Sequence, residues 1–260
     1  MQFGPHVAVL SRFAESHLTG GPDDALIRLK LEHSMHVFDN AGRILDAEGV
    51  SGHVAELTRL AALYHDMGRF PQFARYRTFN DRDSANHARL GVLALRQAEL
   101  PPGLSASDWR VVRFAVAQHN AKAIRPTLRP GLALPVTVVR DADKLDIFRI
   151  LLDHFEGNGE RSEAVIHRLE DAPDRYSDEM YQAILQGRIG DYRHMRYAND
   201  FKLLLTGWLH DLRYHSSLAL ALERDYPARL LAQLPDDTRI RRLRDTIMSS
   251  LRNKNLHPLI

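Results

Sequence analysis

The chain has 260 residues, of which 44% are apolar and 26% charged, and this ordinary globular composition excludes a disordered or fibrous protein. Cysteine is absent, which excludes disulfide frameworks, thiolate zinc sites, iron–sulfur clusters and cysteine nucleophiles. The formal net charge is +2, with both signs mixed along the chain, so we expect no extended basic surface and no nucleic-acid partner.

Helical periodicity runs through most of the chain, since apolar residues recur three and four positions apart and strand-like alternation is scarce. In chain order, this spacing predicts helices that include residues 25–31, 54–64, 111–119 and 147–154. A further buried helix is expected to begin after Pro135, and Gly68 is expected in the left-handed position that ends the helix carrying His65. The sequence therefore predicts an all-α fold.

The composition changes near residue 157, beyond which arginine and tyrosine are more frequent. We therefore expect a core over residues 22–156 and a helical C-terminal part over residues 157–260, and the sequence leaves open whether the two share one hydrophobic core. The C-terminal helices would either shape a pocket or form the surface of a homodimer. Their basic stretch 239–244, RIRRLR, is interpreted as a solvated helix face with Ile240 and Leu243 turned inward.

The N-terminal stretch MQFGPHVAVLSRFAESH lacks a basic segment before a long apolar core, so it does not resemble a signal peptide. No uncharged apolar run approaches the roughly 18–20 residues of a membrane span. The longest candidate, residues 203–209, is too short. We expect a cytoplasmic protein that has no membrane partner.

Histidine is frequent, at 14 residues, and without cysteine any metal must be bound by imidazole and carboxylate groups. Six such residues lie beside apolar helix positions: His33 in LEHSMHV, His65 and Asp66 in LYHDMGR, His87 in SANHARLG, His119 in VAQHN and Asp143 in RDADKLD. Each one alone has an ordinary explanation, as a hydrogen-bonded core histidine or an acid at a helix start. Because a polar group on the apolar side of a helix is costly unless it finds a partner, their recurrence on separate helices favours one metal site inside a bundle.

The order H…HD…H…H…D resembles that of the HD-domain superfamily of metal-dependent phosphohydrolases, over about residues 26–155. HSMHV is similar to the H-S-x-x-V of the first helix in that superfamily, which selects His33 rather than His36. ALYHDMGR resembles the A-L-x-H-D-I-G-K signature, with Met67 in place of Ile and Arg69 in place of Lys.

Two later segments extend the resemblance. NHARLG is similar to the H-x-x-x-G segment, and ADKLD is similar to the A-D-x-L-D segment that closes the site. The second match selects Asp143 rather than its neighbours Asp141 and Asp146. The resemblance implies an all-helical bundle core that holds metal ions between its helices, followed here by a helical C-terminal extension.

In this superfamily pattern, His33, His65, Asp66 and Asp143 would hold a first ion, and Asp66 would bridge to a second ion held by His87 and His119. The presence of the last two histidines argues for two divalent ions. Mixed nitrogen and oxygen ligands suit Mn, Fe, Ni, Co or Zn without choosing among them. Such ions pull the pKa of a bound water from about 15.7 toward neutrality, which provides a nucleophile for hydrolysis.

The expected function is hydrolysis of a phosphate ester in a nucleotide or another small phosphorylated compound. Arg69, three positions after Asp66, can grip a phosphate through two parallel N–H bonds. Lys144, beside Asp143, and Lys122, close after His119, are further candidates for substrate binding. The alternative for all three is a solvated surface charge.

Two other functions stay open at this point. Similar members of the superfamily use the same six ligands to hold two irons and cleave a bond with dioxygen, and ligands alone do not separate the two chemistries. A non-catalytic nucleotide-binding regulatory module would be favoured by a missing ligand, but all six are present.

Three nearby features receive structural interpretations. His36, one turn after His33, would either contact substrate or pack in the core. Asp81 and Asp83 would cap or order the loop that precedes His87. Residues 208–215, WLHDLRYH, imitate the histidine–aspartate motif but lack partner helices, so this segment is interpreted as a packing helix.

Overall fold

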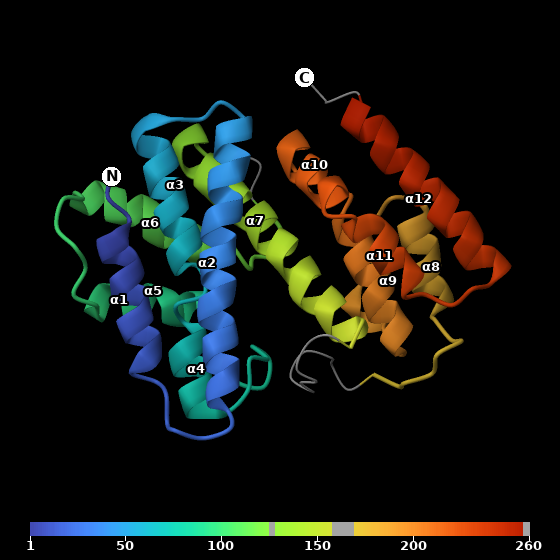
Figure 1. Ribbon diagram of the computed structural model, residues 1–260, viewed down its shortest axis with the longest axis horizontal. Coiled ribbons are helices and arrows are strands. Elements are labelled where there is room, and N and C mark those ends of the chain that lie inside the picture. Colours follow the sequence, from blue (N-terminus) through green and yellow to red (C-terminus); the bar gives the residue numbers. More distant parts are fainter. Residues whose placement is uncertain (125–127, 158–168, 257–260) are drawn as a thin grey trace. The chain divides into compact units, whose positions relative to one another are not determined.

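The computed structural model describes residues 1–124, 128–157 and 169–256, and these residues form helices joined by turns (Figure 1). The β pairing found among them is an isolated parallel bridge between Glu170 and Tyr197. The predicted all-α class is therefore confirmed. Within the same ranges, none of the helices has both the length and the apolar character that crossing a membrane requires.

The chain divides into two compact units, residues 1–146 and 147–260, and the division falls within a single helix. The helices up to this point are α1 (Gly4–Glu15), α2 (Asp24–Ala47), α3 (Gly52–Tyr64), α4 (Arg69–Tyr76), α5 (His87–Gln97), α6 (Ala106–Gln118) and the dividing helix α7 (Pro130–Phe155). The second unit continues with α8 (Asp178–Leu185), η1 (Tyr192–His194), α9 (Ala198–Trp208), α10 (His215–Glu223), α11 (Tyr226–Ala232) and α12 (Thr238–Leu256). The domain limits of 22–156 and 157–260 stay a prediction.

The first unit is a bundle in which α2 packs on α3, α3 on α6, α6 on α5 and α5 on α4. Its interior is lined by fully buried aliphatic side chains that recur at helical spacing, among them Ile44, Leu60, Leu63, Val112 and Val116. Burial of this surface supplies the main stabilising free energy of the bundle. A bundle of this kind directs side chains of several helices toward one interior point.

Polar contacts of Asn40 and Arg140 are among those that join helix α7 to this bundle. The side-chain amide of Asn40, on α2, donates to the carbonyl of Ala142 at 3.2 Å. Arg140 donates to the carbonyls of His119 and Ala121 at 2.8 and 2.6 Å, at the end of α6. A cation at this position satisfies carbonyls that the end of a helix leaves without partners.

The predicted start of this helix after Pro135 is wrong, because α7 begins at Pro130 and contains Pro135. Pro130 occupies the first helical position, where the missing N–H has no partner to lose. Pro135 forgoes one backbone hydrogen bond, and nearby the hydroxyl of Thr137 donates to the carbonyl of Ala133 at 2.9 Å.

Two helices that approach the cluster of predicted ligands begin at side-chain caps. The side chain of Asn86 accepts a hydrogen bond from the backbone N–H of Arg89 at 2.9 Å, so α5 begins directly at His87. Ser105 and Asp108 form a reciprocal capping box that starts α6. These caps fix the register of two helices, one of which begins with a predicted ligand.

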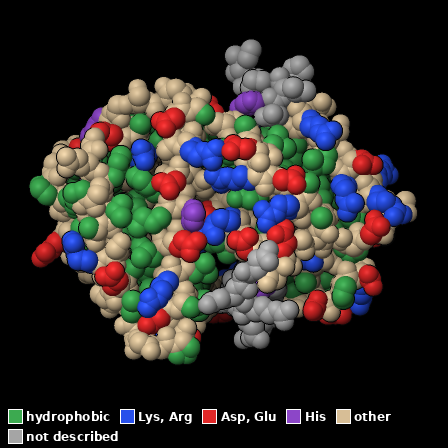
Figure 2. All heavy atoms as spheres, in the orientation of Figure 1, with side chains coloured by type: hydrophobic (Ala, Val, Ile, Leu, Met, Phe, Trp, Pro, Cys, Tyr) green, Lys and Arg blue, Asp and Glu red, His purple; other side chains and the backbone are tan. Residues whose placement is uncertain are grey.

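The second unit has its own apolar interior, which includes Leu203, Leu204 and Leu230. As predicted for the RIRRLR stretch, Ile240 and Leu243 are fully buried on α12. The face drawn in Figure 2 carries basic and acidic side chains interspersed with one another rather than gathered by sign. This distribution accords with the small net charge of the chain.

Gly68 is needed for a close approach of two backbones, and its predicted left-handed conformation is wrong. Its φ is −72°, and the residue directly precedes α4. A Cβ atom at this position would lie 2.0 Å from the carbonyl oxygen of His87 and 2.3 Å from the backbone nitrogen of Gly91. The turn after His65 therefore rests against the first turns of α5, which only glycine permits.

We expect Gly68→Ala to lower the free energy of unfolding by about 1–3 kcal/mol or more, because backbone atoms rather than a flexible side chain obstruct the added methyl group. Thermal or denaturant unfolding measures the effect. Gly131→Ala is the matched control, since a Cβ there meets no atom within 4 Å. Equal stability of the two variants would contradict this account of Gly68.

Candidate metal centre

The structure brings the six predicted ligand residues together inside the first unit. His33 lies on α2, His65 and Asp66 follow the end of α3, His87 begins α5, His119 follows the end of α6, and Asp143 lies on α7. Five of them are buried, and the side chain of Asp143 is 18% exposed. We call these residues the six-residue cluster.

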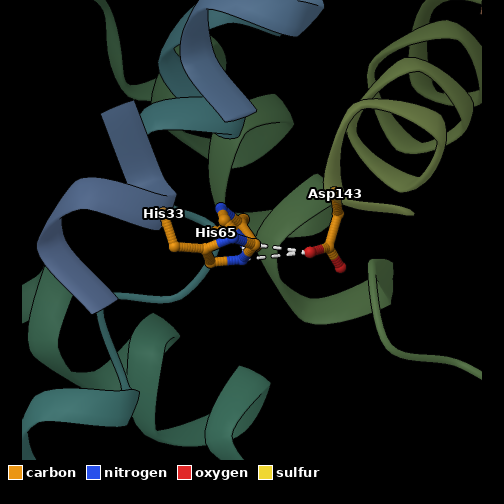
Figure 3. A group of neighbouring side chains, drawn as sticks. All are labelled: His33, His65 and Asp143. Carbon is orange, nitrogen blue, oxygen red and sulfur yellow. Dashed lines mark hydrogen bonds and ion pairs between the residues drawn. The ribbon is translucent and has the colours of Figure 1, made fainter. Parts of the chain in front are cut away.

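The first group in this cluster consists of His33, His65 and Asp143, which point toward one another in Figure 3. The Nε2 atoms of the two imidazoles lie 3.2 Å apart. Asp143 Oδ1 lies 3.1 Å from Nε2 of His33 and 3.6 Å from Nε2 of His65. Three ligand atoms at these separations can contact one cation.

The second group consists of His87 and His119, whose Nε2 atoms lie 3.0 Å apart. Asp66 lies between the two groups. Its Oδ2 is 3.6 and 3.8 Å from Nε2 of His33 and His65, whereas its Oδ1 is 3.5 and 3.7 Å from Nε2 of His87 and His119. Each oxygen of this carboxylate thus faces one pair of imidazoles, which is the position of a bridging ligand.

The other ring nitrogen, Nδ1, of every imidazole in the cluster meets an acceptor. His65 and His119 are the first residues beyond α3 and α6, and their Nδ1 atoms meet the carbonyls of Ala62 and Val116 at 2.8 and 2.7 Å. The last carbonyls of a helix lack backbone partners, so each ring caps the helix that precedes it. This capping fixes the orientation of both rings.

His33 and His87 have carboxylate partners instead, since neither lies at the C-terminal end of a helix, where free carbonyls are found. Nδ1 of His33 lies 2.7 Å from Oδ2 of Asp146, and Nδ1 of His87 lies 2.8 Å from both oxygens of Asp81. Asp81 also accepts from the side chain of Gln72 at 2.9 Å. A carboxylate behind a metal-binding imidazole orients the ring and increases its basicity.

The hydrogen bonds of the Nδ1 atoms show which nitrogen of each imidazole carries the proton. A carbonyl or carboxylate only accepts hydrogen bonds, so each Nδ1 carries a proton, and Nε2 of each neutral ring presents a lone pair. When all four rings are neutral, four lone pairs converge with the carboxylates of Asp66 and Asp143. Such groups repel one another at these distances unless cations lie among them, so this donor set fits divalent metal ions.

The electrostatics of the cluster keep its carboxylates ionised. Burial opposes the charge of Asp66, but Lys30, His65 and Arg69 outweigh it and hold the pKa of that carboxyl well below its usual range. Burial likewise opposes the charge of Asp143, and its hydrogen bonds with His33 and His65 also hold its pKa well below its usual range. Both side chains therefore present negative charge at neutral pH.

In the metal-free protein, two of the imidazoles differ in charge. Burial lowers the pKa of His87 to about 4 despite the opposing bond with Asp81, so this ring is neutral at pH 7. Burial and Lys30 lower the pKa of His33, but the bonds to Asp143 and Asp146 outweigh them and raise it to about 9. Metal binding at His33 would therefore release a proton.

Sequence reasoning missed two partners of the cluster. Asp146 lies one helical turn after Asp143, and Lys30 lies one turn before His33, where its Nζ donates to Oδ2 of Asp66 at 3.0 Å. Each of them lies three positions from a predicted ligand on the same helix face, and this spacing could have identified both from the sequence. The prediction that Asp81 orders the loop before His87 is confirmed by its contact with that ring.

The three predicted phosphate-binding residues occupy different environments. Nε of Arg69 lies 3.4 Å from Oδ1 of Asp66, and its Nη1 donates to the carbonyl of Phe79 and to Gln72. Lys122 is exposed after α6, and Lys144 is half-buried on α7. Their roles toward a substrate stay predictions.

The structure corrects two interpretations made from the sequence, those of His36 and of residues 208–215. The core-facing alternative for His36 is wrong, because its side chain is exposed and lies 3.4 Å from Glu32. The segment 208–215 is not one packing helix, since α9 ends at Trp208 and α10 begins at His215 after a turn. Across the described ranges, the groups able to hold a metal ion are His33, His65 and Asp143, and His65, Asp66 and His119.

We expect Asp81→Ala to weaken binding of one divalent ion by about 10–100-fold, because His87 loses the carboxylate that orients it. Stepwise titration of the metal-free protein with Mn²⁺ measures this. Asp83→Ala is the matched control from the same loop, since Asp83 pairs with the side chain of Asn80. Equal affinities in the two variants would show that Asp81 does not support a metal ligand.

The family model described as HD domain matches residues 31–147, a segment that contains the whole six-residue cluster. No match to the chain was found among curated proteins or among solved structures. HD-domain proteins bind divalent metal ions, and most are metal-dependent hydrolases. Residues 31–147 thus form an HD domain, and over this segment the resemblance to the HD-domain superfamily of metal-dependent phosphohydrolases is supported.

Proposed function

We propose that this chain hydrolyses a phosphate ester of a small compound, such as a nucleotide, with a water activated by two divalent cations. The observation that carries the proposal is the position of Asp66. Its two oxygens face two separate imidazole pairs at 3.5 to 3.8 Å. A carboxylate so placed can hold two cations close together, as hydrolysis of phosphate esters by paired metals requires.

His33, His65 and Asp143 would hold one ion with Asp66, and His87 and His119 would hold the other. The ligand set suits Mn, Fe, Ni, Co or Zn. When bound, such ions lower the pKa of water from about 15.7 toward neutrality and offset charge on phosphoryl oxygens.

The protein side chains supply orientation and charge. Asp146 and Asp81 hold the rings of His33 and His87, while the buried interior limits the access of bulk water to these groups. The guanidinium of Arg69 lies beside Asp66 and would bind a phosphate oxygen. Lys122 and Lys144 remain proposed contacts for the rest of the substrate. The cytoplasmic location of the protein and its assembly as a homodimer stay predictions.

Elemental analysis of anaerobically purified protein, followed by a screen of nucleotides and sugar phosphates, tests the reaction. Phosphate release without dioxygen uptake supports the proposal. Dioxygen uptake by the ferrous protein, with no phosphate release, would instead support the di-iron oxygenase alternative. A protein without metal that still binds a nucleotide would support the regulatory alternative.

We expect Asp66→Ala to abolish both metal content and turnover, because the variant lacks the only carboxylate that faces both imidazole pairs of the six-residue cluster. Elemental analysis and phosphate release measure the two effects. Asp39→Ala, which removes an exposed carboxylate from α2, is the control. Full metal occupancy in Asp66→Ala would show that Asp66 is not the bridge.

We expect Arg69→Ala to raise KM about 10–100-fold with metal retained, since a charged hydrogen bond to the phosphate is lost. Steady-state kinetics and metal analysis measure this. Arg75→Ala, which removes an exposed arginine from the same helix, is the control. Loss of metal from Arg69→Ala would mean that Arg69 supports the cluster through its contacts with Gln72 and Phe79 instead.

A further inference from the structure

Lys30 is a charged group at the cluster that the HD motif does not include. It lies on α2, one turn before His33, and its ammonium donates to Oδ2 of Asp66 at 3.0 Å. The Lys30 side chain is 18% exposed, compared with 4% for Asp66. Lys30 thus extends from partly solvated surface to the buried carboxylate that faces both imidazole pairs.

Arg69 occupies the corresponding position on the other oxygen of Asp66. Its Nε lies 3.4 Å from Oδ1, and its side chain is 16% exposed. Both cations also lie over the ring of Phe79, with Nζ of Lys30 at 5.5 Å and the guanidinium carbon of Arg69 at 5.9 Å from the ring centroid. The ring attracts both cations and keeps them near one another at the partly solvated edge of the cluster.

The loop that carries Phe79 is itself held in place by buried contacts. The carbonyl of Phe79 accepts from Arg69, and the Phe73 ring of α4 packs on the Phe79 ring with centroids 4.9 Å apart. Gln72, which is fully buried, donates to Asp81, Ser84 and Ala85 in the same loop. The two cations are therefore positioned by a fixed surface before any ligand arrives.

Formal charges indicate what these cations bind. Lys30 and Arg69 are the cations in contact with Asp66, one on each of its oxygens. Two divalent ions held by the cluster would add positive charge beside them. Excess charge in a buried site is costly, and a dianion offsets more of it than a monoanion does.

Metal ions bound at Asp66 would also weaken the pairing of Lys30 with that carboxylate. Oxygens of Asp66 that are engaged by metal ions have less negative charge to offer to the ammonium at 3.0 Å. The ammonium then needs another anion within reach, and a phosphate next to the cluster provides charged acceptor oxygens.

We propose that Lys30, together with Arg69, binds the terminal phosphate of the substrate and selects the dianion of a phosphate monoester over the monoanion of a phosphate diester. This inference rests on the proposed hydrolase function and adds the class of ester. Lys30 becomes a substrate-binding residue on α2, opposite the contribution of α4.

Calorimetric titration of the Mn²⁺-loaded protein with inorganic phosphate, and separately with dimethyl phosphate, tests the proposal. The wild-type protein should bind phosphate more tightly. Lys30→Gln should lower phosphate affinity about ten- to hundredfold and dimethyl phosphate affinity much less, with metal content and melting temperature retained. Lys30→Arg should keep part of the preference, and Arg28→Gln, an exposed position on the same helix, should keep all of it.

The possible results distinguish the proposed role of Lys30 from the proposed hydrolase function. Unchanged phosphate affinity in Lys30→Gln would overturn the role of Lys30, and so would an equal loss for both anions. Loss of metal from Lys30→Gln would overturn it as well, since the ammonium would then serve the cluster rather than the substrate. Failure of the metal-loaded wild-type protein to bind phosphate would instead count against the proposed function itself.

Discussion

The buried charge of Asp66 is the constraint on which the rest of the first unit depends. A carboxylate that is only 4% exposed is costly unless partners surround it on every side. Those partners come from α2, α4, α5 and the residues that follow α3 and α6. Because no single helix could provide them, the bundle must bring five separate segments to one point, and its helix contacts and its glycine turn serve that requirement.

Two physical devices orient the imidazoles around this carboxylate. His65 and His119 lie just beyond helix ends, where unpaired backbone carbonyls accept their Nδ1 protons. His33 lies within a helix and His87 begins one, so carboxylates perform the same task there. In all four cases Nε2 is left facing inward, and this shared orientation makes the site suited to cations rather than to a catalytic acid and base pair.

The proposed metal ligands and the proposed phosphate-binding side chains differ in their exposure to solvent. The ligand atoms are buried, whereas Lys30 and Arg69 are partly solvated and lie over one aromatic ring. In the proposed function, metal binding and phosphate binding would thus fall to different side chains that meet at Asp66. In the proposed hydrolase, this carboxylate would couple the two, because any cation that it holds changes the charge available to Lys30.

The sequence by itself determined the helical class, from apolar spacing, and the six residues of the cluster, from their resemblance to the HD pattern. Both predictions use only the order of residues along the chain. Tertiary structure alone decided the partners: Asp66 meets Lys30 across 36 positions, and His33 meets Asp146 across 113. It also decided the role of Gly68, whose need for space comes from α5 rather than from its own turn. Helical spacing shows which residues share a face, but the groups opposite that face depend on how helices pack, and local sequence does not encode that packing.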